Sequence, residues 1–148
     1  VKGPNVFKGY WGLPEKTKED FSEDGFFNTG DKGVIDEDGY ISIIGRSKDM
    51  IISGGLNVYP KEIESLIDKI EGVQESAVIG LNDQDLGEKV VAIIVSSEEL
   101  TLDEKEVIAE IKNQLAGFKV PKEVKFIKQL PRNAMGKVQK NILRDTFS

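Results

Sequence analysis

The chain has 148 residues, of which 39% are hydrophobic and 31% charged, a composition typical of a soluble globular protein rather than a disordered, fibrous or membrane-spanning one. Its 20 Lys and Arg against 26 Asp and Glu give a net charge of −6, which disfavours a nucleic-acid-binding surface. The sequence contains no cysteine and no histidine. Thiol chemistry, Ser-His-Asp hydrolysis and zinc sites with Cys or His ligands are therefore excluded, and no metal site is predicted.

Glycine-punctuated turns and short strands are predicted for residues 1–45. Residues 33–45 read as two strands around an Asp-Glu-Asp-Gly turn, in which Gly39 supplies the positive φ of a hairpin loop. The segment is too short to bury a core alone. It opens on Val1 in what reads as the middle of a strand, with no signal peptide or lipidation motif. We expect a fragment of a longer cytoplasmic protein.

Helices and strands alternate from residue 49 to residue 148, which favours a small two-layer α+β domain. Pro60 fits the first position of a helix that ends before Gly72, and Thr101 with Glu104 forms a capping box for a second helix. The remaining predicted elements are an apolar strand at 49–52 before a turn at 53–55, strands at 73–81, 90–96 and 124–127, and a helix at 139–147.

A loop at residues 131–137, with the sequence PRNAMGK, presents a lysine on a glycine-turned backbone. Arg132, Lys137 and Lys140 gather there in an otherwise acidic chain, and such a group suits an anion. The spacing alone fits an ordinary solvated lysine better, because the phosphate-binding pattern GxxxxGK[ST] lacks its first glycine and its hydroxyl. Lys140 and Lys128 are expected to be exposed as well.

Five further residues are ambiguous from the sequence alone. Asp31 follows a Thr-Gly turn, where a carboxylate either binds a diol such as a ribose or serves only the turn. Arg46 and Lys48 lie in a polar connector, where they bind phosphate or are solvated. Gly54 and Gly55 mark either a close approach of a ligand to the backbone or a tight turn. Taken singly, the structural alternative is preferred in each case.

Three segments together resemble the carboxy-terminal motifs of the adenylate-forming superfamily of AMP-binding enzymes, which includes acyl-CoA synthetases. They are GFFNTGD at 25–31, GYISIIGRSKDMIISGGLNVYPKEIE at 39–64 and LPRNAMGKVQK at 130–140. The resemblance covers essentially the whole chain and is strongest to the malonyl-CoA synthetase branch, which acts on small dicarboxylic acids. It implies a ligase of fatty acid metabolism that uses ATP, Mg²⁺ and CoA as substrates and makes an acyl-adenylate and then an acyl-CoA.

The resemblance also implies a domain division and a role for each ambiguous residue. Residues 1–45 would end a large N-terminal domain, 46–48 would form a hinge, and 49–148 would be a mobile C-terminal domain. The implied roles are nucleotide binding for Asp31 and Arg46, the hinge pivot for Lys48, the pantetheine channel for Gly54 and Gly55, and catalysis of adenylation for Lys137.

The resemblance has further implications for partners and activity. The Pro-x-x-x-x-Gly-Lys context resembles targets of lysine acetyltransferases, with Lys137 as the acceptor. The phosphate loop and the acyl pocket would lie in the N-terminal domain, so the fragment alone is expected to be inactive and to bind none of these ligands tightly. Two alternatives stay open: the end of a peptide-synthetase adenylation domain that loads a carrier protein, and a non-catalytic nucleotide-binding module.

Overall fold

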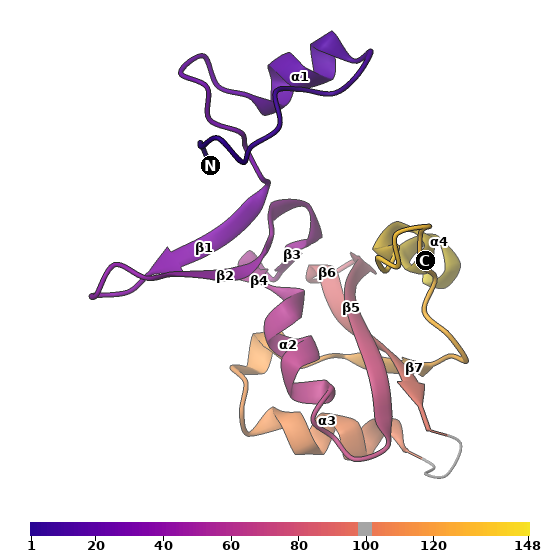
Figure 1. The fold of residues 1–148 in the computed structure, drawn as a ribbon. Helices are drawn as coiled ribbons and strands as arrows, with labels where there is room; N and C mark the ends of the chain where they lie inside the picture. Colours follow the sequence, from indigo (N-terminus) through magenta and orange to yellow (C-terminus); the bar gives the residue numbers. More distant parts are fainter. Residues whose placement is uncertain (98–101) are drawn as a thin grey trace. The chain divides into compact units, whose positions relative to one another are not determined.

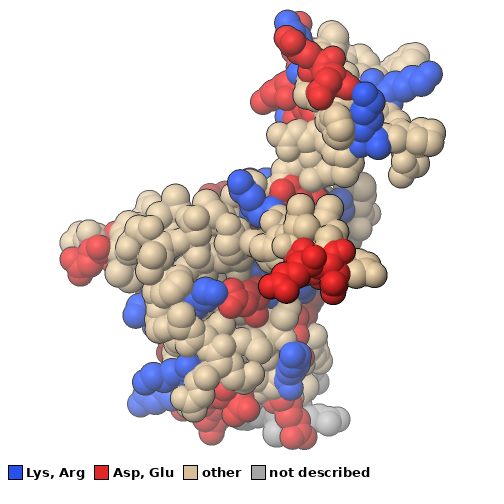
Figure 2. Space-filling model, turned by 90° about the vertical axis from the view of Figure 1, so that its left-hand side faces the viewer, with Lys and Arg blue, Asp and Glu red and all other residues tan. Residues whose placement is uncertain are grey.

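The fold is known from a computed structural model that describes residues 1–97 and 102–148. It divides into two compact units, Val1–Ile43 and Ile44–Ser148. In the described part of the chain, no helix is long and apolar enough to cross a membrane. On the face shown in Figure 2, basic and acidic side chains are interspersed among uncharged atoms.

The first unit contains a short helix and most of a two-stranded sheet. Strands β1 (Asp31–Ile35) and β2 (Ile41–Arg46) form the predicted hairpin, and the end of β2 continues into the second unit. In the turn, the Asp36 carboxylate accepts hydrogen bonds from the N–H groups of Asp38 and Tyr40 at 3.0 and 2.8 Å. Gly39 has the expected positive φ, +86°, so the turn chemistry was predicted correctly.

Helix α1 (Pro14–Asp20) was not expected, because residues 1–45 were predicted to hold only turns and strands. Pro14 occupies its first turn, where a missing N–H costs nothing. The segments on either side meet in an aromatic cluster, in which the Phe7 ring lies 5.4 Å from Phe21 and 4.9 Å from Phe27 between centroids. At seven residues, the helix is too short to show a clear apolar period.

The second unit is built on a five-stranded sheet of order β4-β3-β6-β5, with β7 parallel to β6 (Figure 1). Its long antiparallel pair, β5 and β6, runs from Val73 opposite Ser96 to Asp83 opposite Gly87, with a register shift between Val73 and Glu75. The strands are β3 (Ile51–Ser53), β4 (Leu56–Val58), β5 (Val73–Asp83), β6 (Gly87–Ser96) and β7 (Glu123–Phe126). The strand β4 was not predicted, because three residues give too little alternation.

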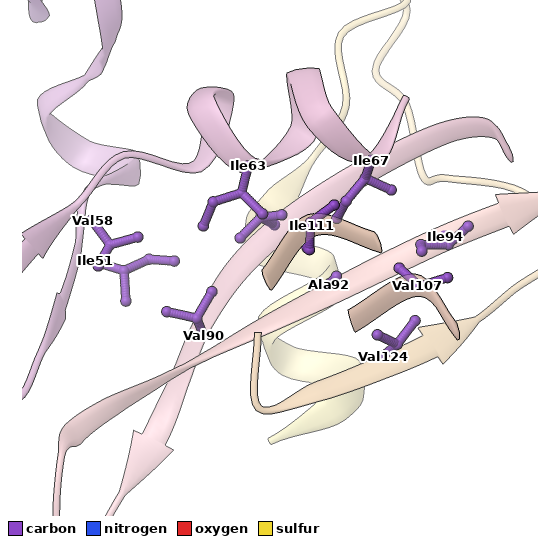
Figure 3. Packing of buried hydrophobic residues seen from close by; sticks show 11 residues of the cluster. Ile51, Val58, Ile63, Ile67, Val90, Ala92, Ile94, Val107, Ile111 and Val124 are labelled. Carbon is purple, nitrogen blue, oxygen red and sulfur yellow. The ribbon is translucent and has the colours of Figure 1, made fainter. Parts of the chain in front are cut away.

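Alternate residues of β5 and β6 are buried on opposite faces of this sheet. On one face, Val90, Ala92 and Ile94 meet the helices α2 (Pro60–Ile67) and α3 (Glu104–Lys112), as Figure 3 shows. On the other face, Val91 and Ile93 pack with Leu130 and with Leu143 of α4 (Lys140–Phe147). The α+β class is thus confirmed, and α4 adds a cover to the face opposite α2 and α3.

The capping box of α3 lies two residues later than predicted. Thr101 falls outside the described residues, and α3 begins at Glu104 with Asp103 as its N-cap. The Asp103 carboxylate accepts from the Lys105 N–H at 2.7 Å, and the Glu106 carboxylate accepts from the Asp103 N–H at 3.2 Å. Both positions offer a hydroxyl or carboxylate followed three residues later by Glu, so the pattern alone does not choose between them. Two 3₁₀ turns, Ser47–Asp49 and Gly117–Lys119, complete the unit.

Neighbouring residues of α4 provide a direct test of the second core. Leu143 is 2% exposed and Ile142 is 41% exposed, so one faces the core and its neighbour in the same helix faces solvent. We expect Leu143→Ala to lower the free energy of unfolding by about 2–5 kcal/mol, because it leaves a cavity. The matched change Ile142→Ala should cost less than about 1 kcal/mol. Denaturant titration followed by circular dichroism measures both, and equal losses would contradict the assigned core.

The carboxylate of Glu123 in β7 gives a pH-dependent prediction. Its hydrogen bond from Lys89, and a second from Lys125 at 2.9 Å, hold the pKa of Glu123 below its ordinary value of 4.5. Because the pKa is lower in the folded state, the ionised carboxylate stabilises the folded protein at pH values above 4.5. This stabilisation is lost as pH falls through the folded-state pKa. We expect Glu123→Gln to cost about 0.5–1 kcal/mol at pH 7. The difference from wild type should shrink progressively as pH falls below 4.5 and vanish once Glu123 is protonated in the folded state as well. A difference that does not shrink with falling pH would contradict this assignment.

Candidate functional site

A groove of about 740 Å³ in the second unit gathers basic side chains around the loop that holds Lys137. Its lining comes from the end of β2, the turn that follows, the loop before α4 and α4 itself. The charged lining residues are Arg46, Lys48, Asp49, Lys137, Lys140 and Arg144. Five cations against one carboxylate make the groove suited to an anion, although the chain as a whole is acidic.

The loop that presents Lys137 is organised by the side chain of Asn133. Its Oδ1 accepts hydrogen bonds from the N–H groups of Met135 and Lys137, both at 3.0 Å, and the Asn133 N–H donates to the Lys137 carbonyl at 2.9 Å. Gly136 adopts a φ of +76°, which glycine reaches without strain. The guanidinium of Arg132 donates to the Gly136 carbonyl at 2.6 Å. The backbone at Lys137 is therefore fixed on both sides.

The side chain of Lys137 differs from the basic groups around it. Residue 137 is exposed, and within residues 1–97 and 102–148 its ammonium takes part in no hydrogen bond or ion pair. A cation on a braced backbone at the rim of a basic groove is available to an external anion. Lys137 is thus the strongest candidate for a ligand-contacting group in the second unit.

Lys140 is not exposed as Lys137 is, contrary to expectation, whereas Arg132 is exposed but paired. Lys140 is the first residue of α4, its side chain is only 15% exposed, and its ammonium lies 2.6 Å from a Glu64 carboxylate oxygen. Arg132 forms an ion pair with Glu75 in β5. The prediction that Lys140 is exposed is wrong, because the first turn of α4 brings Lys140 onto an acidic residue distant in sequence. Lys128 is exposed as expected.

Of the other predicted site residues, Arg46 and Lys48 belong to the second unit and Asp31 to the first. Arg46 ends β2 and Lys48 lies in the following 3₁₀ turn, and both line the groove with Lys137. Asp31 begins β1 in the other unit, where its N–H donates to the Thr29 hydroxyl at 3.1 Å. The roles predicted for Asp31, Arg46 and Lys48 stay predictions.

Gly54 and Gly55 form the two-residue turn of the β3–β4 hairpin, and neither is among the residues that line the groove. Their φ angles are +57° and +78°, as in the hairpin turns that favour glycine or asparagine. The Gly54 N–H donates to the Leu86 carbonyl at 2.8 Å. A Cβ built at Gly55 would meet nothing within 4 Å, so the first requirement for glycine there is the backbone turn.

Sequence reasoning missed Glu64, which the structure shows to be the main anionic partner of this region. It lies on α2 between the apolar positions of a helix face, where a charged residue ordinarily indicates the solvated side. Its burial is explained by partners distant in sequence, the Val78 N–H and the Lys140 ammonium, which lie 14 and 76 residues later in the chain. Among the residues that the structure describes, no cluster of acidic side chains could hold a metal ion.

The sequence and fold of the chain match those of known proteins. Residues 62–137 match the family described as AMP-binding enzyme C-terminal domain. The chain is 60% identical to ATP-bound MatB from Rhodopseudomonas palustris, with a TM-score of 0.88 over 99% of this chain and 29% of that one. Against o-succinylbenzoate CoA synthetase from Bacillus subtilis, solved with its acyl-adenylate, the identity is 35% and the TM-score 0.90, over 97% of this chain and 29% of that one.

A curated relative gives the same result from sequence. Feruloyl-CoA synthase of an Amycolatopsis species is 46% identical over 147 residues, which cover 99% of this chain and 30% of that protein. This chain spans less than a third of the length of the curated relatives that it matches. The resemblance to the adenylate-forming enzymes is confirmed. The chain belongs to the AMP-binding enzyme C-terminal domain family.

Proposed function

We propose that this chain is the C-terminal part of an AMP-forming acyl-CoA synthetase. In the first half-reaction, a carboxylate oxygen of the acid attacks the α-phosphorus of ATP, and pyrophosphate leaves with Mg²⁺. In the second, the thiol of CoA loses its proton and attacks the acyl carbonyl, and AMP leaves. The observation that supports this most strongly is the exposed Lys137 ammonium on a braced loop in a basic groove, in a chain of this family.

Lys137 serves the adenylation half-reaction in this proposal. Negative charge shifts onto the phosphate oxygens as the acid attacks, and a fixed cation stabilises that charge more than it stabilises the ground state. The hydrogen bonds from Asn133 and Arg132 hold the loop backbone before the ligand arrives. The loop therefore needs little reorganisation during the reaction.

The remaining site residues serve binding and the change between half-reactions. The Asp31 carboxylate can accept hydrogen bonds from both hydroxyls of a ribose, and Arg46 lies near the same nucleotide. Lys48, in the turn between β2 and β3, is the pivot of a hinge at residues 46–48 on which the C-terminal domain, residues 49–148, rotates. Gly54 and Gly55 then line the channel of the pantetheine arm.

The acid itself is proposed to be a small dicarboxylic acid such as malonate. This finer proposal rests on the sequence resemblance and on the 60% identity to MatB. Relatives named for ferulic acid and for o-succinylbenzoate share the same C-terminal architecture. The acid is therefore selected outside the groove described here.

Lys137 is also proposed as the acceptor for a lysine acetyltransferase. Acetylation would remove the cation on which adenylation depends. The structure gives a reason for selectivity over its neighbour, because Lys140 is largely buried and paired with Glu64. A paired, buried ammonium is a poor nucleophile, whereas the Lys137 side chain is exposed.

Lys137→Ala in the complete protein is expected to reduce acid-dependent pyrophosphate–ATP exchange about 100-fold or more, because one transition-state contact is lost. Thioester formation from supplied acyl-adenylate and CoA should persist at near the wild-type rate. The control Lys128→Ala removes an exposed lysine of the same unit and should change neither rate. Equal losses in both half-reactions would contradict the role of Lys137.

Gly55→Asn is expected to slow thioester formation at least about 10-fold while adenylation is retained, because the new side chain projects into the pantetheine channel. Asparagine tolerates the positive φ of this turn, so the hairpin should persist. The matched control is Gly39→Asn, at another hairpin glycine with positive φ and open space around it. The two half-reactions are measured separately. If adenylation fell as far as thioester formation, the channel assignment would be wrong.

A further inference from the structure

A buried carboxylate joins three elements beside the Lys137 loop. Glu64, in α2, is 8% exposed. Its Oε1 accepts a hydrogen bond from the Val78 N–H in β5 at 2.9 Å and another from the Lys140 ammonium at 2.6 Å. Because both charges are largely withdrawn from water, the interaction is screened much less than a surface ion pair.

This ion pair passes around the edge of the sheet. Strand β5 is the last in the order β4-β3-β6-β5, and Val78 belongs to it. Helix α2 packs on one face of the sheet through Ile63, whereas α4 packs on the other through Leu143. The Glu64–Lys140 bond therefore connects two layers that the sheet separates, at the level of Val78.

The same edge strand holds the other end of the Lys137 loop. Arg132 forms an ion pair with Glu75, also in β5. Lys137 lies between these two attachments, three residues before Lys140 in sequence. The Arg132 pair is more exposed, with side chains 40% and 29% accessible, against 15% and 10% for the Lys140 pair. The attachment at Lys140 is therefore the less screened of the two by solvent.

We propose that Glu64 is a positioning residue for Lys137, which acts through Lys140 and the first turn of α4. The proposal rests on the adenylation role of Lys137 proposed above. Glu64 is not among the residues that line the groove, so it positions the loop without touching the ligand. A displacement of a reacting group by about 1 Å can cost on the order of 100-fold in rate.

The core itself gives no reason for a charge at this position. The residues packed around α2 are apolar, and a buried ion pair is often no more stabilising than apolar residues of similar volume. A carboxylate adds a geometric restraint that an apolar side chain would lack, because it accepts hydrogen bonds from both the Val78 N–H and the Lys140 ammonium. It thus fixes where α4 begins relative to β5.

The test uses Glu64→Gln in the complete protein. The amide oxygen can still accept from Val78, but the charge that holds Lys140 is gone. We expect kcat of acid-dependent pyrophosphate exchange to fall about 10- to 100-fold, with thioester formation from supplied acyl-adenylate unchanged. Hydrogen exchange of the backbone amides at 131–139 should become faster, and KM for ATP should change less than kcat.

Two further variants keep the test decisive. Glu123→Gln, the matched control, breaks ion pairs of β7 instead and should alter neither half-reaction nor the exchange of the loop amides. Glu64→Asp retains the charge on a side chain one methylene shorter, and we expect a smaller loss of adenylation with the same selectivity. If Glu64→Gln does not fold, Glu64→Asp carries the test.

The outcomes separate this proposal from the proposed function. Unchanged loop exchange in the Glu64 variants, or equal losses in both half-reactions, would overturn the positioning role while leaving an adenylating wild type intact. A wild-type protein without acid-dependent exchange would contradict the proposed function, and the positioning of a catalytic lysine with it. Faster loop exchange with a selective loss of adenylation supports both.

Discussion

The antiparallel pairing of β5 with β6 is the constraint on which the rest of the second unit depends. These strands alternate apolar residues on both faces, so the sheet is stable in water only when each face is covered. Helices α2 and α3 cover one face, and Leu130 with α4 covers the other. In the chain, Leu130 comes just before the Lys137 loop and α4 follows it, so the burial of Leu130 and Leu143 anchors the loop on both sides.

Charge distribution then distinguishes two lysines that the sequence places three residues apart. Lys140 is drawn to a buried carboxylate and stabilises the architecture, whereas the Lys137 ammonium is exposed beside a basic groove. Removing either partner of the buried pair would leave an uncompensated charge. The rigidity around Lys137 thus comes from neighbours whose own charges are neutralised by Glu64 and Glu75.

Elements with strong local sequence signals were predicted correctly. Features that depend on contacts between residues far apart in the chain were not predicted. Pro60, the apolar periods and the glycine turn at Gly39 sufficed for α2, for the long strands and for the first hairpin. Helix α1 and strand β4 are too short for a period, and the capping box admitted two positions. Lys137 was identified from its motif. The burial of Glu64 and Lys140 was not, because it arises from residues far apart in the chain that meet only at the edge of β5.

The central claim is that Lys137, held in place by the Glu64–Lys140 pair, is the cation that meets the nucleotide during adenylation. A crystal structure of the complete protein with bound ATP tests this most directly. We expect the Lys137 ammonium to lie about 3 Å from a phosphate or substrate carboxylate oxygen, with the bond between Glu64 and Lys140 intact. A structure in which Lys140 has left Glu64 to contact the nucleotide, while Lys137 points into solvent, would contradict the account.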